Sequence, residues 1–286
     1  METVAAVLAA TGWWYPASEA LLLMFTALVF LELGVDAATG RRDRSWRETA
    51  SNVMTAVPNT VISATAAAAC AAIGLTAVAA FAPWSVPLSG WSWAVALVLA
   101  DLSYYVGHRL DHRVRLLWAH HSVHHSSTDF DLSMSLRIAW HDGLITWVYS
   151  IPMALIGFHP GQIIIANLLV LVYQTWVHTR RIARLPWWFE AVFNTPSHHR
   201  VHHASNPRYL DANFGGVLIV WDRLFGTFVE EDEPVVYGVT VPINSINPLR
   251  VNFGAYLDLA RELRRAGTPR DVAKVLVGPP EWHLPE

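Results

Sequence analysis

Histidine is the residue type through which this chain could do chemistry. Ten of its 14 histidines fall in two short windows, residues 108–125 and 198–203. Pairs such as His108 and His112 are four residues apart, which places both imidazoles on one face of a helix, where both can bind one ion. One such pair is a weak signal. Three clusters are different, because packing many imidazoles together costs solvation and gains nothing unless something binds them.

The donor type narrows the choice of metal. Nitrogen-rich sites suit iron, zinc, copper or nickel rather than magnesium or calcium. A lone zinc ion takes at most four protein ligands, so eight or more candidate histidines predict two metal ions. The His-Glu-x-x-His pattern of zinc hydrolases fails, because Arg109 follows the first histidine. The single cysteine, Cys70, excludes a cysteine-based zinc or iron–sulfur site.

The composition predicts that these clusters belong to an all-α integral membrane protein. Hydrophobic residues make up 53% of the 286 residues and charged residues 15%, against about 25% charge in soluble domains. The net charge of −3 offers no positive field to nucleic acid. We expect four to five transmembrane or re-entrant helices. The apolar stretches are residues 20–35, 53–81, 91–106, 143–158 and 161–177.

Arginine placement predicts the orientation of these helices. The segments after the first, third and fifth stretches are basic, whereas the loop 82–90 carries no charge. The basic segments then share one side, which the positive-inside rule makes cytoplasmic. Both histidine windows lie just beyond stretch ends on that side. We therefore expect one membrane-embedded domain over residues 1–286, in which residues 107–142 and 178–250 form a cytoplasmic helical cap with a dimetal site and residues 251–286 form a C-terminal helix and tail.

The histidine boxes and their surroundings resemble one superfamily. The boxes His108-x3-His112, His121-x2-His124-His125 and His199-x2-His202-His203 resemble those of the fatty acid hydroxylase/sterol desaturase superfamily, whose members are membrane enzymes with a histidine-ligated di-iron centre that activates O2. Longer strings within residues 95–250, such as Asn-Thr-Pro-Ser-His-His-Arg-Val-His-His at 194–203, resemble the alkylglycerol monooxygenase branch.

This resemblance implies a set of metal ligands: His108, His112, His121, His124, His125, His178, His199, His202 and His203. His178 matches the extra histidine that the branch carries between its second and third boxes. Further ligands, or hydrogen-bond partners of the ligands, are expected among His120, His141, His198, Asp101, Asp211 and Asp222. We expect His159 and His283 to be ordinary surface residues. The sequence assigns no substrate-binding residue and no catalytic residue apart from the metal ligands.

The predicted function is a membrane-bound di-iron monooxygenase that hydroxylates a C–H bond of a lipid, in an ether-lipid alkyl chain or an acyl chain, with O2 and an external reductant. Side chains alone cannot attack such a bond, so the metal must carry the chemistry. The resemblance implies tetrahydrobiopterin as reductant, with a ferredoxin or cytochrome as the alternative. A sterol or carotenoid desaturase or hydroxylase, and more distantly a metal transporter, are the competing functions. The lipid and the oligomeric state are left open.

Overall fold

The structure is a computed structural model, and it describes residues 14–285. Residues 1–13 and 286, which the predicted domain includes, lie outside the described part. Within residues 14–285 every regular element is a helix, and the paired extended residues form two isolated bridges, Phe193 with Leu218 and Ala204 with Tyr237. The predicted all-α class is confirmed.

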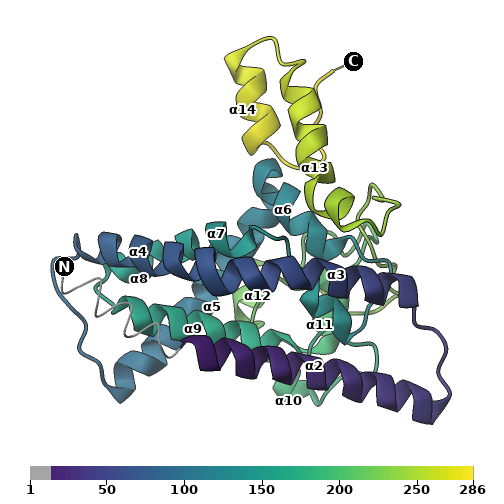
Figure 1. Cartoon of the computed structure of the whole chain (residues 1–286), viewed down its shortest axis with the longest axis horizontal. Coiled ribbons are helices and arrows are strands. Elements are labelled where there is room, and N and C mark those ends of the chain that lie inside the picture. The colour runs from purple at the N-terminus through teal and green to yellow at the C-terminus, as the bar shows by residue number, and fades with distance from the viewer. Residues whose placement is uncertain (1–13, 286) are drawn as a thin grey trace.

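Long helices form the body of the molecule, and a two-helix arm projects from it (Figure 1). The long helices are α2 (Trp14–Thr39), α3 (Trp46–Ile62), α4 (Ala68–Ala79), α5 (Gly90–Arg113), α6 (Arg115–His125) and α9 (Pro160–Gln174), with the π-helical turn η1 (Ser63–Ala67) between α3 and α4. Short helices connect them: η2 (Leu132–Leu136), α7 (Asp142–Thr146), η3 (Trp147–Ser150), α8 (Ile151–Leu155), α10 (Trp187–Glu190), α11 (Pro196–His202) and α12 (Val220–Phe225). The arm consists of α13 (Pro248–Leu263) and α14 (Pro269–Val277).

Two of the predicted apolar stretches are not single helices. Residues 143–158 divide among α7, η3 and α8, because Pro152 at the start of α8 has no N–H to continue the preceding helix and Gly157 ends α8 at φ 96°. The stretch 53–81 breaks at the π-helical turn η1, whereas Pro58 lies inside α3. None of the described helices alone has the length and hydropathy expected of a membrane-spanning helix. The helices at residues 46–62 and 65–79, which are bent by 45° relative to each other, have that length and hydropathy when taken together.

Small side chains let the helices of the apolar core approach closely. Ala96 and Ala100 of α5 and Ala166 of α9 are fully buried, and α5 packs along α9. Larger residues from α4, α8, α9 and the connection between α8 and α9 fill the space around them, as expected for a close-packed interior. These are Leu75, Met153, Phe158, Ile163 and Val170. The core therefore fixes α5, whose C-terminal turns carry the first histidine box.

Gly107 shows how tightly α5 is held. A Cβ at this position would lie 2.3 Å from the ring of Tyr149, which itself donates a hydrogen bond to Asp111. We expect Gly107→Ala to destabilise the protein by about 1–3 kcal/mol, because overpacking displaces the ring, and to lower the melting temperature. Gly254→Ala on α13 meets no atom closer than 3.9 Å and should be neutral or stabilising. Equal melting temperatures for the two variants would contradict this packing.

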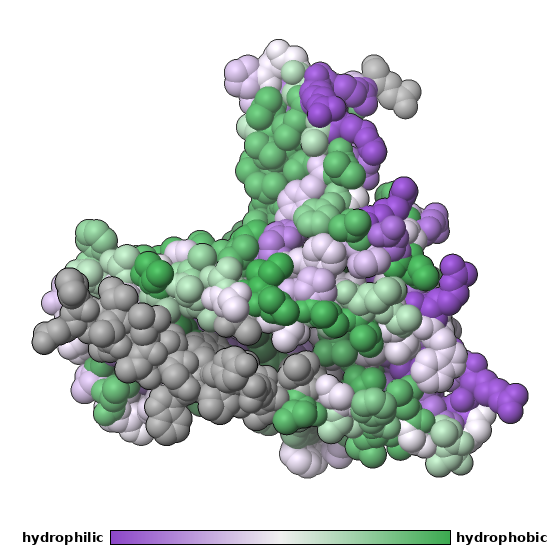
Figure 2. Space-filling view, in the orientation of Figure 1, coloured by the Kyte–Doolittle hydropathy of each residue, from purple (hydrophilic) through white to green (hydrophobic). Residues whose placement is uncertain are grey.

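Ion pairs join the polar segments at one end of the molecule. Arg44 pairs with Glu32 at 2.7 Å and with Asp131 at 2.6 Å, and Arg180 pairs with Asp129 at 2.6 Å. Hydrophilic residues gather over the α2–α3 connection and along one side of the arm in Figure 2. The basic segments after α2 and α9 thus meet at the segment that follows the second histidine box.

A buried ion pair joins the arm to α6, beside the apolar contact between Val251 and Val123. Glu262 of α13 accepts a hydrogen bond from Arg115, and the Leu284 backbone N–H donates to its second oxygen at 2.6 Å. The Arg115 contact lowers the pKa of Glu262 from 4.5 to about 2. A carboxylate with a lowered pKa stabilises the folded state above its ordinary pKa, and this stabilisation is lost as the pH falls through the folded value.

We therefore expect the arm to loosen between about pH 4.5 and pH 2. Limited proteolysis at pH 5 and pH 3 should show faster cleavage between α13 and α14 at the lower pH. Glu262→Gln should be cleaved at the faster rate at both values. A wild-type rate that does not change over this range would argue against the ion pair as the fastening contact.

Candidate metal centre

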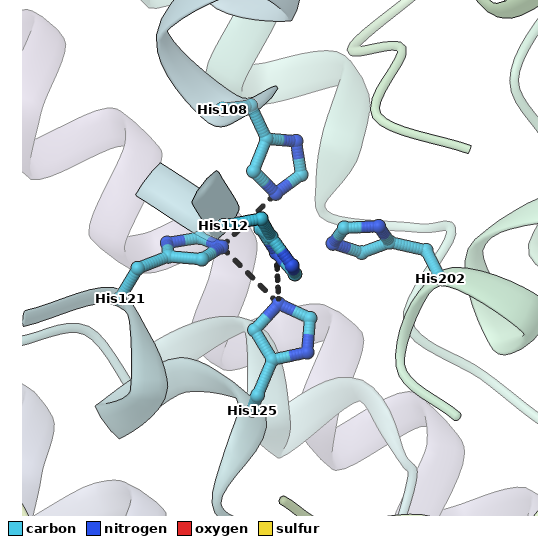
Figure 3. Close-up of side chains that lie close together, drawn as sticks. All are labelled: His108, His112, His121, His125 and His202. Carbon is cyan, nitrogen blue, oxygen red and sulfur yellow. Dashed lines mark hydrogen bonds between the residues drawn. The ribbon is translucent and has the colours of Figure 1, made fainter. Parts of the chain in front are cut away.

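Five histidines from three helices converge in a first cluster (Figure 3). They are His108 and His112 of α5, His121 and His125 of α6, and His202 of α11. The extended residue Val114 separates α5 from α6 and turns the chain back, so the last turns of α5 face α6. The Nε2 atoms of His108 and His121 are 3.0 Å apart, and that of His125 lies 3.1 Å from those of His112 and His121.

Four further histidines form a second cluster beside the first. They are His124 of α6, His178 after α9, and His199 and His203 in the third box. The Nε2 atom of His178 lies 3.1 Å from that of His124 and 2.8 Å from that of His199. All four are buried, and the rings of His125 and His203 stack at 4.3 Å between the clusters. The structure thus brings together all nine histidines that the resemblance implies.

Backbone carbonyls fix the tautomer of four of these rings. A carbonyl oxygen can only accept, so each Nδ1 that contacts one must carry the proton and donate it. The pairs are His108 with Phe214, His202 with Ala212, His124 with Arg137 and His178 with Gln174, at 2.9–3.2 Å. In each neutral ring the Nε2 atom therefore presents its lone pair to the cluster.

The rings are neutral at pH 7 because they are buried together. Burial, which penalises the charged form, lowers the pKa of His124 to about 4 and that of His202 to about 3. For His108 and His199, burial and the neighbouring histidines lower the pKa well below its ordinary value. Neutral imidazoles are the form that binds metal ions.

The lone pairs need an acceptor that the protein does not provide. The Nε2 atoms of His124 and His178 face each other at 3.1 Å with no proton to share, because both rings donate from Nδ1. The Nε2 atom of His202 is buried, has no hydrogen-bond partner in the described part of the chain, and points into the first cluster (Figure 3). A metal cation in each cluster would accept these lone pairs, so the residues fit two nitrogen-ligated ions.

The spacing of the nitrogen atoms also fits a metal ion. Metal–imidazole bonds of about 2.0–2.1 Å place adjacent ligands of an octahedral ion about 3.0 Å apart, and the contacts within the clusters are 2.8–3.1 Å. Five ligands in the first cluster exceed the four of a tetrahedral zinc site. Both sets leave octahedral positions open to a further ligand.

Two of the predicted carboxylates act on the loop that orients the rings. Asp222 accepts hydrogen bonds from the backbone N–H groups of Phe214 and Gly215 at 2.7 Å each. Asp101 accepts from the N–H groups of Val217 and Leu218. Neither carboxylate belongs to a cluster. Their contribution is to hold residues 214–218, from which the Phe214 carbonyl accepts the His108 proton.

The other predicted candidates lie outside the two clusters. Asp211 borders the first cluster, 3.7 Å from His112 Nδ1.

The remaining histidines each contact other groups. His198 contacts Phe228 and Thr195, and His141 hydrogen-bonds to the hydroxyl of Tyr256 at 2.7 Å. His120 lies beside Asp111 and Asp142, His159 caps α9, and His283 contacts Glu262.

The sequence did not identify the groups that orient the ligands. Four are backbone carbonyls, which any residue type supplies, so no sequence signal marks them. Asp142, which lies beside His120, and Tyr149, which donates to Asp111, also went unnoticed, because their positions depend on how residues 142–150 fold back. The only available signal was an acid directly after His141 at the start of a helix.

Comparison with known proteins places this site in a family. Residues 93–227, which contain both clusters, match the fatty acid hydroxylase family model. The predicted resemblance is confirmed. No solved structure matches the chain significantly.

Among characterised relatives the chain is similar to alkylglycerol monooxygenases. The human enzyme is 45% identical over 172 residues, which cover 60% of this chain and 37% of that protein. The Caenorhabditis elegans enzyme is 34% identical over 214 residues, 70% of this chain and 41% of that protein. The ornithine lipid hydroxylase of Rhizobium tropici is 28% identical over 141 residues, 49% and 42% of the two chains. The chain thus spans about two fifths of the length of these relatives.

Proposed function

We propose that this protein is a membrane-bound di-iron monooxygenase that hydroxylates a C–H bond of a lipid. The observation that carries the proposal is the pair of clusters in which nitrogen atoms of nine histidines converge on two points, with the lone pairs of four rings directed inward. The names of the relatives, alkylglycerol monooxygenase above all, support a lipid substrate. When bound, two iron ions would supply the activation of O2 that side chains cannot.

The protein's own part is to hold the ligands and keep water away. His108, His112, His121, His125 and His202 would hold one ion, and His124, His178, His199 and His203 the other. Eight of these nine side chains are buried. The carbonyls behind the rings fix their orientation, as outer hydrogen bonds do in metal sites generally.

A membrane location follows from the same proposal. Large apolar side chains are exposed along the long helices, far beyond what a soluble monomer normally presents. Examples are Phe30, Val57, Ile73, Val98 and Leu169. We propose that these helices lie in the bilayer, and that the end at which the basic segments meet faces the cytoplasm with the metal centre, as the positive-inside rule predicts.

We propose an ether-lipid alkyl chain as the substrate, with an acyl chain as the second candidate. Oxidation of the carbon next to the ether oxygen consumes O2, two electrons and two protons, and gives a hemiacetal and water. The hemiacetal then releases an aldehyde and a glycerol alcohol. The electrons come from a tetrahydropterin or from a ferredoxin or cytochrome. The similarity to an ornithine lipid hydroxylase favours the second candidate.

The test is incorporation of labelled oxygen. The full chain, purified in detergent and loaded with Fe²⁺ under argon, receives ¹⁸O2, a reductant and either an alkylglycerol or an acyl lipid. We expect about two iron ions per chain and ¹⁸O in the aldehyde, trapped at once as the alcohol. ¹⁸O retained in an intact acyl lipid would assign the second substrate. Fewer than one iron per chain, with both lipids unlabelled, would overturn the proposal.

A further inference from the structure

A second group of metal-binding side chains borders the first cluster. Asp111 lies in the last turn of α5, His120 in the middle of α6, and Asp142 at the start of α7. None of the three belongs to the nine-histidine set. One ligand atom each of Asp111, His120 and His121 lie within 4.8 Å of one another.

The buried His120 ring lacks well-aligned hydrogen-bond partners. Its side chain is 1% exposed, and within residues 14–285 neither Nδ1 nor Nε2 has a hydrogen bond of good geometry. Buried polar atoms are paired in nine or more of ten cases, because an unpaired one pays its full desolvation cost. The Nδ1 atom has no partner among the described residues, and Nε2 lies at ion-pair distance from two carboxylates without forming a well-aligned hydrogen bond to either. The ring therefore has room for a partner that joins it to these carboxylates.

The distances around His120 indicate what kind of partner this is. Its Nε2 atom lies 3.4 Å from an oxygen of Asp142 and 3.9 Å from one of Asp111. A charge-assisted hydrogen bond would be about 2.7–2.9 Å long. Ligands on one ion with bonds of about 2.1 Å are separated by about 3.0–3.4 Å, or about 4.2 Å when they lie opposite each other. Both distances exceed that of a charge-assisted hydrogen bond, and the 3.4 Å distance to Asp142 falls within the range for two ligands of one cation.

Asp111 and Asp142 have surroundings that are common for carboxylate ligands of metal ions. The Tyr149 hydroxyl donates to Asp111, and outer hydrogen bonds of this kind commonly fix a ligating carboxylate. Asp111 is buried, whereas the Asp142 side chain is 29% exposed. Asp142 thus opens a path by which an ion can reach His120 from solvent.

We propose that Asp111, His120 and Asp142 bind a third metal ion beside the dimetal centre. One imidazole and two carboxylates form a mixed nitrogen–oxygen set, which suits a divalent first-row ion such as Zn²⁺ or Mn²⁺. The ion would tie α5, α6 and α7 together behind the first cluster. It is the third only if the proposed function is correct, but its binding does not depend on that function.

The experiment measures the difference in metal content between matched variants. The full chain in detergent is loaded with Zn²⁺, freed of excess metal and measured by mass spectrometry of the elements. We expect His120→Ala to bind one ion fewer per chain than the wild type, and Asp142→Asn to bind Zn²⁺ at least 10-fold more weakly. His159→Ala, a histidine remote from every cluster, should match the wild type.

Equal metal content in His120→Ala and the wild type would overturn the third site, whatever the total. If His120→Ala does not fold, Asp142→Asn decides alone, because its exposed side chain is the easier one to replace; an unchanged affinity then overturns the proposal. Failure of the dimetal centre looks different, since it lowers the metal content of wild type and variants alike while leaving their difference of one ion.

Discussion

Replacing His178 by alanine is expected to empty the second cluster and to abolish lipid hydroxylation. The His178 Nε2 atom lies between those of His124 and His199 and carries its lone pair toward both. Removing it takes away one of four ligands and leaves the other lone pairs without a common ion. Loss of an outer hydrogen bond costs about 10–100-fold in affinity or activity, so loss of a ligand should exceed 100-fold. Iron per chain and labelled product measure the two effects.

His198→Ala is the matched control for this variant. His198 is also a buried histidine next to a proposed ligand, but its ring contacts Phe228 and Thr195 rather than either cluster. It should keep both iron ions. If His198→Ala loses as much iron as His178→Ala, the division of the histidines into ligands and bystanders is wrong.

Asp222→Ala should be among the most destabilising single substitutions in the chain. The carboxylate is fully buried and accepts three hydrogen bonds of 2.7 Å, from the N–H groups of Phe214 and Gly215 and from the hydroxyl of Thr227. Each buried donor left unpaired costs about 1–3 kcal/mol, so we expect a loss of about 3–5 kcal/mol. The loop also supplies the carbonyl that orients His108, so iron affinity should fall about 10–100-fold.

Two control variants distinguish the stability loss of Asp222→Ala from the effect of removing any negative charge. Asp222→Asn keeps one acceptor oxygen and should lose less stability than the alanine variant. Asp258→Ala removes an exposed carboxylate whose partner, Arg261, lies three residues on; such pairs are worth at most about 1 kcal/mol. A melting temperature for Asp222→Ala close to that of Asp258→Ala would contradict the role of Asp222.

The sequence predicted which histidines lie together better than it predicted how they divide between the two clusters. The four-residue spacing of His121 and His125 correctly placed both on one face of α6, since that spacing is a property of the helix alone. The assignment of His124 to the second cluster, and of His202 to the first, depends on how α6 and α11 cross. That crossing is set by packing between segments more than 70 residues apart in the sequence. The local spacing of residues does not predict such packing.

The same limit explains the differences in the fold. Residues 143–158 are apolar throughout, so their composition predicted a single helix, whereas Pro152 and the turn at Gly157 divide them. The predicted C-terminal segment starts at residue 251, whereas helix α13 begins three residues earlier, at Pro248, because Asn247 caps it and Pro248 fits its first turn. Helix α14 was not predicted, since it is only nine residues long.

The facing lone pairs of His124 and His178 have a thermodynamic consequence for the chain without metal. Holding two unshared electron pairs 3.1 Å apart in a dry interior raises the free energy of the metal-free native state, whereas the unfolded chain relieves it by solvation. Folding and metal loading are therefore linked equilibria. Free metal at 100 times its dissociation constant adds about 2.7 kcal/mol to the stability of the native state. On the proposed function, metal supply as well as sequence sets how much of this protein stays folded.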